Sequence, residues 1–232
     1  MEKQPDFSNG AYLFPHIHPE GMRFGAIALA LPVAAAVLSC WFWWLGCLVA
    51  PLLLLAYGVF LFFRDPERYP PDDPKAILSP ADGRVCLVQK ITLPEELETG
   101  DPAEYWRVSI FMSVFNVHVN RLPLAGTVRK RAYVKGKFLN ASLDKASKDN
   151  ERCAWLVESA GGVRYAVVQI AGLVARRIVP FVDEGAELAT AERFGLIRFG
   201  SRLDVYLPAG VEPAVRTGQT MTAGETVLGR LS

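Results

Sequence analysis

The longest feature of the hydropathy pattern is an unbroken apolar stretch near the beginning of the chain. No Asp, Glu, Lys or Arg occurs between Phe24 and Phe63, and this stretch is about twice as long as one membrane-spanning helix requires. A tryptophan-rich segment that ends in glycine, Cys40–Gly46, lies near its middle. Because tryptophan favours the lipid–water boundary and glycine permits the chain to reverse, the pattern predicts a helical hairpin with limbs at Phe24–Cys40 and Cys47–Phe63.

Basic residues flank this hairpin at both outer ends. Arg23 precedes the first limb, and Arg64 and Arg68 follow the second. Since basic residues next to membrane helices stay in the cytoplasm, both ends are predicted to lie on the cytoplasmic face of the inner membrane. A cleaved signal peptide has a shorter apolar core that begins earlier, so the pattern argues against a signal peptide here. A hairpin that dips into one leaflet, kinked at Pro32 and Pro51, remains an alternative to one that crosses.

A polar, proline-rich segment, Arg64–Pro74, ends the hairpin, and the pattern then changes to that of a strand-rich domain. Short apolar or alternating runs rich in Val, Ile, Tyr and Phe are separated by Gly, Pro, Asn and Asp. The strand candidates are Val85–Val88, Trp106–Met112, Gly126–Val134, Ala154–Glu158, Tyr165–Ile170 and Leu203–Leu207, and the short helix candidates are Pro94–Thr99 and Asn140–Lys148. The predicted fold class is α+β, with a tail and membrane-anchoring hairpin over residues 1–63 and a strand-rich domain over residues 64–232.

Composition narrows the classes of partner and cofactor. The chain has 25 Lys and Arg against 24 Asp and Glu, so its net charge gives no support for a nucleic-acid partner. The four cysteines form no Cys-x-x-Cys pair, which argues against a zinc site and a disulfide framework. Two of the three histidines, His16 and His18, lie in the N-terminal tail without the acidic or thiol neighbours of a metal site. No metal is expected.

Three short motifs supply side chains for chemistry. His118 lies in an apolar, strand-like run, the tight turn Ser79–Gly83 presents Asp82, and Ser201 follows Gly200 between two strand-like runs. Taken singly, each motif also fits a structural role: a buried histidine with a partner, an Asp-Gly turn and a glycine bend. Together they offer an acid, a base and a hydroxyl, the components of a Ser–His–Asp arrangement.

Five short segments, in this order along the chain, resemble the short bacterial phosphatidylserine decarboxylases. They are Phe62–Pro66, Ser79–Gly83, Asn116–His118, Asn150–Arg152 and Phe199–Ser201. The resemblance extends from Phe62 to the C-terminus, and its specificity comes from the set because each segment is short. It implies an enzyme that decarboxylates phosphatidylserine to phosphatidylethanolamine.

The resemblance also implies that the chain is a proenzyme that cleaves itself between Gly200 and Ser201. The Ser201 hydroxyl attacks the Gly200 carbonyl, and His118, oriented by Asp82, acts as the base. Glycine suits the position before the nucleophile because its backbone distorts with little steric penalty. The two fragments remain associated as a large and a small subunit, and Ser201 becomes a pyruvoyl group.

In the second stage that the resemblance implies, the pyruvoyl group forms a Schiff base with the serine amine of the lipid and withdraws the electrons left by carbon dioxide. No metal or diffusible cofactor is needed, and the partners are phosphatidylserine and the lipid bilayer. Longer family members carry a second histidine three positions after the first, and here that position is Arg121. Arg121 is a candidate to bind the substrate carboxylate or phosphate, with a structural role as the alternative.

Several alternatives remain at the level of sequence. A related lipid with a serine headgroup, such as archaetidylserine, offers the same reacting group. A membrane-anchored Ser–His–Asp hydrolase would stay a single chain, although the sequence lacks a Gly-x-Ser-x-Gly elbow. In a non-enzymatic membrane-tethered binding domain, the pair Gly200–Ser201 would be only a turn. The basic run Arg129–Lys137 fits either a solvated strand or a contact with an anionic bilayer.

Overall fold

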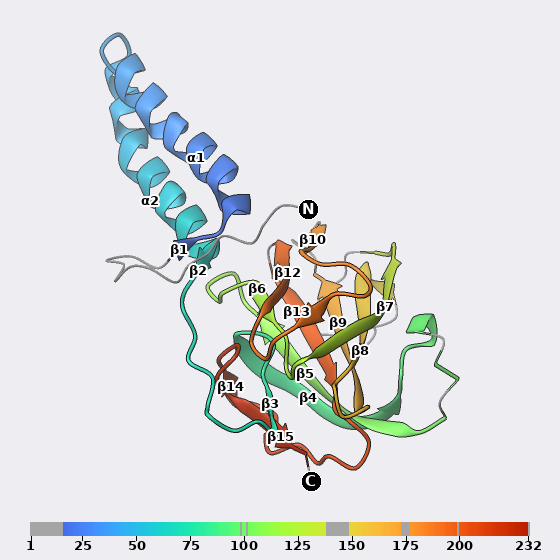
Figure 1. Ribbon diagram of the computed structural model, residues 1–232. Coiled ribbons are helices and arrows are strands. Elements are labelled where there is room, and N and C mark those ends of the chain that lie inside the picture. Colours follow the sequence, from blue (N-terminus) through green and yellow to red (C-terminus); the bar gives the residue numbers. More distant parts are fainter. Residues whose placement is uncertain are drawn as a thin grey trace. The chain divides into compact units, whose positions relative to one another are not determined.

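The chain forms two compact units, Met1–Glu67 and Arg68–Ser232. The computed structural model describes residues 16–97, 99–100, 102–137, 149–172, 177–198 and 200–231. The first unit contains two long helices, and the second consists mainly of β-strands (Figure 1). The α+β fold class with an N-terminal helical hairpin is therefore confirmed.

The hairpin consists of α1 (Pro19–Leu38) and α2 (Gly46–Phe62), joined through a short 3₁₀ helix, η1 (Trp43–Leu45). Helix α1 begins earlier than the apolar pattern predicts. Proline is favoured in the first turn of a helix, and Nδ1 of His18 accepts a hydrogen bond of 3.2 Å from the amide of Glu20. His18, expected as part of a tail, therefore caps this helix.

Small residues on α1 allow the two helices to pack closely. The buried positions of α1 are Gly21, Gly25, Ala28, Pro32 and Ala35. A Cβ atom on Gly21 would lie 2.3 Å from Cβ of Phe63, and one on Gly25 would lie 2.5 Å from Cε1 of Phe60. Larger side chains at these two positions would push the helices apart, as at the small-residue seams of membrane helix pairs.

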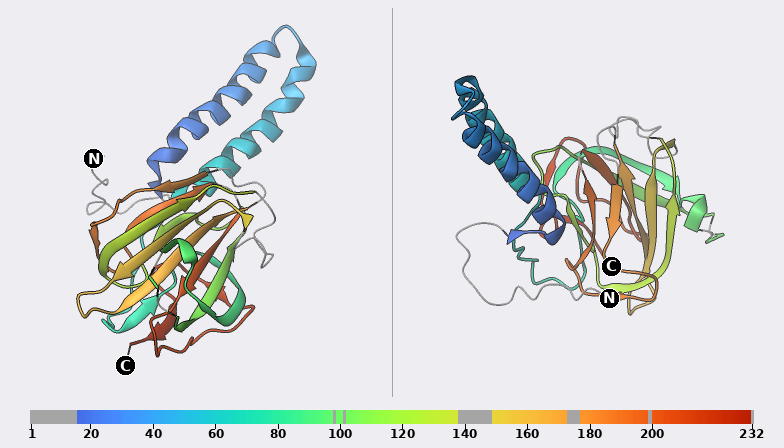
Figure 2. Two further views of the ribbon diagram at one scale, coloured as in Figure 1. Left: turned by 90° about the vertical axis from the view of Figure 1, so that its right-hand side faces the viewer. Right: turned by 90° about the horizontal axis from the view of Figure 1, so that it is seen from above.

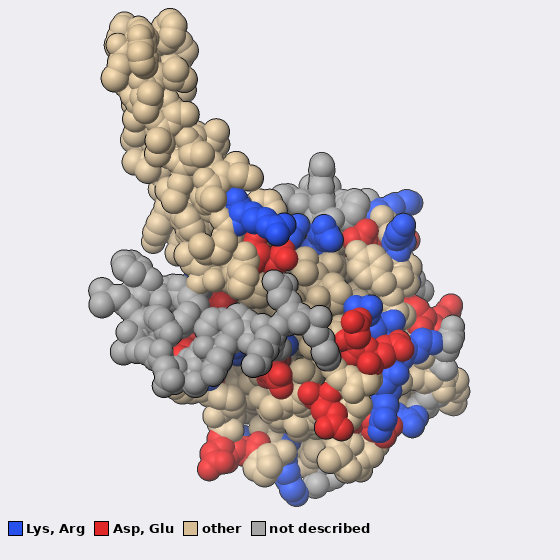
Figure 3. Space-filling model, turned by 45° about the horizontal axis from the view of Figure 1, so that its top comes forward, with Lys and Arg blue, Asp and Glu red and all other residues tan. Residues whose placement is uncertain are grey.

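Both arms of the hairpin are long and apolar enough to cross a membrane, by length and composition, over Pro19–Leu38 and Trp43–Phe62. Only 11% of the most apolar window of the second arm is buried, whereas the core helix of a soluble protein buries its large apolar side chains. The outer part of the helical pair shows no Lys, Arg, Asp or Glu in Figure 3. This unit is therefore suited to association with a membrane.

The second unit is organised around an eight-stranded antiparallel sheet, in the order β11-β7-β8-β9-β13-β5-β4-β14 (Figures 1 and 2). Its strands are β4 (Gly83–Thr92), β5 (Glu104–Met112), β7 (Gly126–Val134), β8 (Arg152–Glu158), β9 (Arg164–Ala171), β11 (Glu187–Leu188), β13 (Ser201–Tyr206) and β14 (Thr220–Met221). All six predicted strands are confirmed, with ends that differ by a few residues. The helix predicted at Pro94–Thr99 is a 3₁₀ turn, η2 (Glu95–Leu97), and Asn140–Lys148 lies outside the described residues.

Smaller sheets complete the two units. A three-stranded sheet has the order β10-β12-β6, and β15 pairs with β3 in the second unit, while β1 pairs with β2 in the first. These strands are β1 (His16–Ile17), β2 (Arg64–Asp65), β3 (Ala76–Leu78), β6 (Val119–Arg121), β10 (Arg177–Pro180), β12 (Arg193–Arg198) and β15 (Val227–Arg230).

Strand β13 is buried on both faces. Leu203 and Val205 belong to one core cluster, and Tyr206 belongs to a second cluster on the other face. All six residues of the strand are buried, including Ser201 and Asp204. Because a buried polar group destabilises a fold unless it has partners or a function, the polar residues of this strand direct attention to it.

Candidate active site

Ser201 is the first residue of β13, inside the large sheet. It lies opposite Met112 of β5 on one side and opposite Ala171 of β9 on the other. The residue is fully buried, and its hydroxyl makes no hydrogen bond within the described part of the chain. A buried hydroxyl without a partner costs about 1–3 kcal/mol. Ser109 in the middle of β5 shares this property, so Ser201 is distinguished by the glycine that precedes it.

Gly200 precedes this serine with a backbone conformation that favours glycine. Its φ angle is +45°, in the left-handed region, and an added Cβ atom would have no neighbour within 4 Å. The preference for glycine here therefore comes from the backbone angle and not from crowding. The Gly200–Ser201 peptide bond lies at the junction where the chain passes from β12 to β13.

His118 immediately precedes β6, and it is fully buried. Its Nδ1 atom lies 2.9 Å from the carbonyl oxygen of Asn116. A carbonyl oxygen accepts but does not donate, so this contact places the ring proton on Nδ1 and the lone pair on Nε2. The tautomer that results is the one that a general base of the Ser–His type requires.

The fold brings His118 and Ser201 to the same end of the second unit. The amide of Ile197 donates to the carbonyl of His118 at 3.3 Å, and Ser201 follows Ile197 by four residues. Four residues span at most about 14 Å between their Cα atoms. Ile197 and Met112, the neighbours of His118 and Ser201 across their strand pairs, belong to one core cluster.

Asp82 lies in the turn between β3 and β4, and other groups hold its carboxylate. Nη2 of Arg68 lies 2.9 Å from Oδ1 and 2.8 Å from Oδ2, and the amide of Ala223 donates to Oδ1 at 2.8 Å. Arg68, which the sequence suggests only as a basic residue after the hairpin, thus pairs with Asp82. The contact expected between Asp82 and His118 stays a prediction.

The turn that carries Asp82 nevertheless lies against the strands of the site. The amide of Arg121 donates to the carbonyl of Pro80 at 2.9 Å. A Cβ atom on Gly83 would lie 2.2 Å from the carbonyl oxygen of Phe111 in β5, so this turn approaches β5 very closely. The three motifs that the sequence singles out therefore come together through β5, β6 and β12.

Arg121 occupies the last position of β6 and is 6% exposed. Its Nη1 atom donates to the carbonyl of Ala191 at 3.1 Å. Ala191 has a φ angle of +62°, which is unusual for a residue other than glycine. The guanidinium is thus anchored on a strained turn close to the Asp82 region, and its role in substrate binding stays a prediction.

Comparison with known proteins places the chain among lipid decarboxylases. The sequence profile described as phosphatidylserine decarboxylase matches residues 56–229. Relatives named "Phosphatidylserine decarboxylase proenzyme" from Novosphingobium aromaticivorans and Erythrobacter litoralis are 53% and 54% identical over 226 residues, covering 94% of this chain and 88% and 89% of their own lengths. A protein of the same name from Zymomonas mobilis is 47% identical over 239 residues, covering 100% of this chain and 95% of its own length.

The chain belongs to the phosphatidylserine decarboxylase family. The family match begins inside α2 and ends inside β15, so it covers all three motifs. The three motifs follow one another along the chain at the starts of three strands: Asp82 before β4, His118 before β6 and Ser201 at the beginning of β13. Membership in the phosphatidylserine decarboxylase family is thus confirmed by the profile and by the named relatives.

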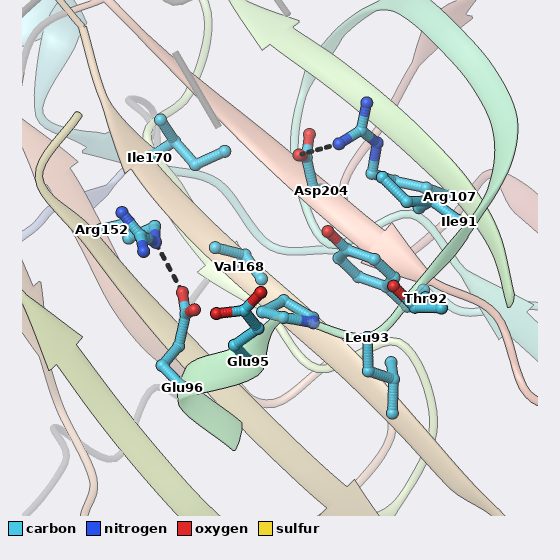
Figure 4. Close-up of a pocket in the computed structure, with 12 residues that line it drawn as sticks. Ile91, Thr92, Leu93, Glu95, Glu96, Arg107, Arg152, Val168, Ile170 and Asp204 are labelled. Atoms are coloured by element: carbon cyan, nitrogen blue, oxygen red, sulfur yellow. Dashed lines mark hydrogen bonds and ion pairs between the residues drawn. The ribbon is translucent and has the colours of Figure 1, made fainter. Parts of the chain in front are cut away.

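A cavity of about 420 Å³ is lined by residues of β4, β5, β8, β9 and β13 and by the segment that contains η2 (Figure 4). Asp204 and Tyr206 of β13 line it, and alternate residues of a strand point to opposite faces, so Ser201 points away from it. Burial raises the pKa of Tyr206 to about 12, which keeps its hydroxyl neutral. The cavity is therefore separate from the Ser201 side chain.

Several charged residues of the cavity lining take part in ion pairs. Arg202 holds Asp204 through two contacts of 2.8 and 2.9 Å, and Arg107 approaches the same carboxylate at 3.9 Å. At the rim, Arg152 pairs with Glu96 at 2.5 Å (Figure 4). Among the residues that the structure describes, no group of three or more His, Cys, Asp or Glu side chains could hold a metal ion.

Proposed function

We propose that this chain is a membrane-anchored decarboxylase of phosphatidylserine that cleaves its own Gly200–Ser201 bond and carries a pyruvoyl group at position 201. The observation that carries the proposal is the junction of β12 and β13. There a buried serine hydroxyl without a partner in the described residues directly follows a glycine with a left-handed φ angle. The membership in the family supplies the reaction that this junction serves.

Self-cleavage begins at the Ser201 hydroxyl. His118 takes the proton through Nε2 while Nδ1–H remains on the Asn116 carbonyl, so the ring keeps its orientation as it becomes charged. The serine Oγ forms a bond to the carbonyl carbon of Gly200, and the bond from that carbon to the serine nitrogen then breaks. The nitrogen gains the proton, and the amide becomes an ester.

The ester is then cleaved by elimination. Loss of the Ser201 α-proton breaks the Cβ–Oγ bond, which leaves a carboxylate on Gly200 and a dehydroalanine at position 201. Water hydrolyses the tautomer of this group and releases ammonia. The buried, unpartnered position of the Ser201 side chain fits a group made from this residue, and the pyruvoyl group supplies an electron sink for loss of carbon dioxide.

The lipid substrate and the helical hairpin belong together in this proposal. Relatives are named for phosphatidylserine, and a decarboxylase of a bilayer lipid gains from being held at the bilayer. The two apolar helices provide the anchor, and the basic residues at both outer ends favour the cytoplasmic face of the inner membrane. The two fragments remain associated because Ser201–Tyr206 pairs with β5 and β9 of the larger fragment.

The deciding experiment is the intact mass of the purified protein under denaturing conditions. We expect two chains, split after Gly200, with the mass of the smaller chain showing a pyruvoyl group in place of Ser201. Ser201→Ala should give one intact chain. A single wild-type chain that releases carbon dioxide from phosphatidylserine at full rate would overturn the proposal, and a single chain that reacts with serine-directed phosphonates would favour the hydrolase.

Ser109 provides the matched control for this experiment. It is also fully buried, and its hydroxyl likewise lacks a hydrogen bond within the described residues, but it lies in the middle of β5. Ser109→Ala should therefore cleave like the wild type. If both alanine variants stop cleavage, loss of folding and not loss of the nucleophile is the cause.

A further inference from the structure

The loop that leads to His118 presents apolar side chains to the solvent. Val114 is 44% exposed and Phe115 is 81% exposed. The loop is not loose, because Oδ1 of Asn116 accepts hydrogen bonds of 2.8 Å from both the amide and the hydroxyl of Ser113. The amide of Asn116 also donates to the carbonyl of Ser113 at 2.9 Å. A closed turn therefore holds the phenyl ring outward, next to the proposed base.

Two arginines lie directly opposite each other in the small sheet beside this loop. Arg177 of β10 pairs with Arg198 of β12, and the next pair, Ile178 and Ile197, is buried in the core. By alternation, the arginines face away from that core. Arg177 is exposed and Arg198 is partly exposed. Two cations directly opposite each other in a sheet repel, and a layer of lipid phosphates next to them would reduce this repulsion.

The apolar tip and the arginine pair lie at the same end of the second unit. The amide of Ile197 donates to the carbonyl of His118. Because β12 and β6 are antiparallel, the next residue of β12, Arg198, lies beside Val117, the residue before His118. Strands β6, β12 and β10 lie side by side in Figure 1. Gly200 comes two residues after Arg198, so the cleavage junction is at this end as well.

We propose that this end of the second unit docks onto an anionic phospholipid bilayer, with Phe115 inserted at the headgroup boundary and Arg177 and Arg198 at the lipid phosphates. A single exposed phenylalanine is ordinary on a protein surface. Here the ring is rigidly presented, it neighbours a basic pair, and the same chain carries two helices suited to a membrane. The inference rests on the proposed action on a bilayer lipid, whose headgroup would then enter the site from the plane of the membrane.

Depth measurement tests the insertion of the loop without relying on catalysis. The full-length chain, with its four cysteines replaced, carries a spin label at Phe115→Cys in nanodiscs of phosphatidylcholine and phosphatidylglycerol, a lipid that the decarboxylation does not consume. We expect the label about 5–10 Å below the headgroup boundary, protected from a water-soluble nickel complex and accessible to oxygen. The same nickel accessibility as for a label in water would overturn the proposal.

A label at Ala160→Cys provides the control. Ala160 is exposed in the turn between β8 and β9. Strand β9 runs from this turn to Ala171, which lies opposite Ser201, so the turn is at the far end of the sheet, about 25 Å away. This label should remain in water. If both labels are protected, the bilayer covers the unit in general and the proposed docking end is wrong.

The arginine pair is tested by charge removal. Arg177→Gln should lower the ratio of inserted to exposed label at position 115 about five-fold, and the effect should shrink at high salt. Arg164→Gln, which removes an exposed arginine paired with Glu158 at the far end, should leave the ratio unchanged. Equal insertion in phosphatidylcholine alone would overturn the anionic part of the proposal. A protein that never releases carbon dioxide would contradict the proposed function. The accessibility of the spin labels could still be measured in that protein, so the two proposals can fail separately.

Discussion

His118 and Asp82 illustrate how far single residues were predictable. The sequence predicts the serine, the histidine and the aspartate as site residues because their types and order resemble a family, and their roles stay predictions. The sequence does not predict the contact of His118 with Asn116, because the contact is with a main-chain carbonyl and any residue type at position 116 would supply one. The pairing of Asp82 with Arg68 was also missed, because it joins residues that are separated along the chain by the β3 strand.

These contacts give an order of severity for substitutions at the proposed base. His118→Ala removes the group that accepts the serine proton, and general-base catalysis is worth about 100- to 10,000-fold in rate. Asp82→Asn should slow self-cleavage less, because the Asn116 carbonyl still holds the Nδ1 proton of His118. An intact-mass time course after expression measures both rates. A His118→Ala protein that cleaves at the wild-type rate would remove His118 from the first stage.

A substitution at Arg121 tests self-cleavage and decarboxylation separately. Its guanidinium is bound to the carbonyl of Ala191 and takes no part in the cleavage scheme, so Arg121→Ala should mature into two chains. If Arg121 holds the lipid carboxylate or phosphate, the matured variant should then lose decarboxylation, because a charge-assisted, two-pronged contact is lost. Carbon dioxide release from phosphatidylserine vesicles is the measurement. Full turnover would leave this arginine a structural role.

At the scale of elements, the local pattern predicted the strands and the hairpin but not how they pair. Alternating apolar runs marked all six predicted strands, and the uncharged stretch marked both helices. The order β9-β13-β5 brings together segments that lie far apart in the chain. The residues of one strand do not specify which distant strand pairs with it. The helical prediction at Pro94–Thr99 was too long, because its proline and acidic residues form only one 3₁₀ turn.

The packing of α1 on α2 gives a prediction for this element pair. Gly25→Val should push the helices apart, because its side chain would occupy the position of the Phe60 ring. Gly58→Val is the control, since an added Cβ atom there meets nothing within 4 Å. The distance between spin labels at Met22→Cys and Tyr57→Cys, in a cysteine-free chain in nanodiscs, should increase for Gly25→Val alone. An unchanged distance would show that the glycine seam does not set the packing.

At the scale of the whole molecule, the apolar helices and the residues proposed for self-cleavage lie in different units. All residues assigned to self-cleavage lie in the second unit, which has its own buried core and its own pairing of β13 with β5 and β9. The apolar helices lie in the first unit. This division follows from the sequence, because the charged and proline-rich segment after Phe63 separates two regions of very different hydropathy.

Deletion of Met1–Phe63 tests this division. The shortened protein should still split after Gly200, because Ser201, His118 and Asp82 all remain. It should leave the membrane fraction in high salt or carbonate, because the loop at Phe115 and the arginine pair provide only a weak contact that salt screens. Membrane fractionation and intact mass on the same sample measure both properties. A shortened protein that stays with the membrane through both washes would show that the hairpin is not the main anchor, whereas one that is released but never splits would place part of the cleavage machinery in the first unit.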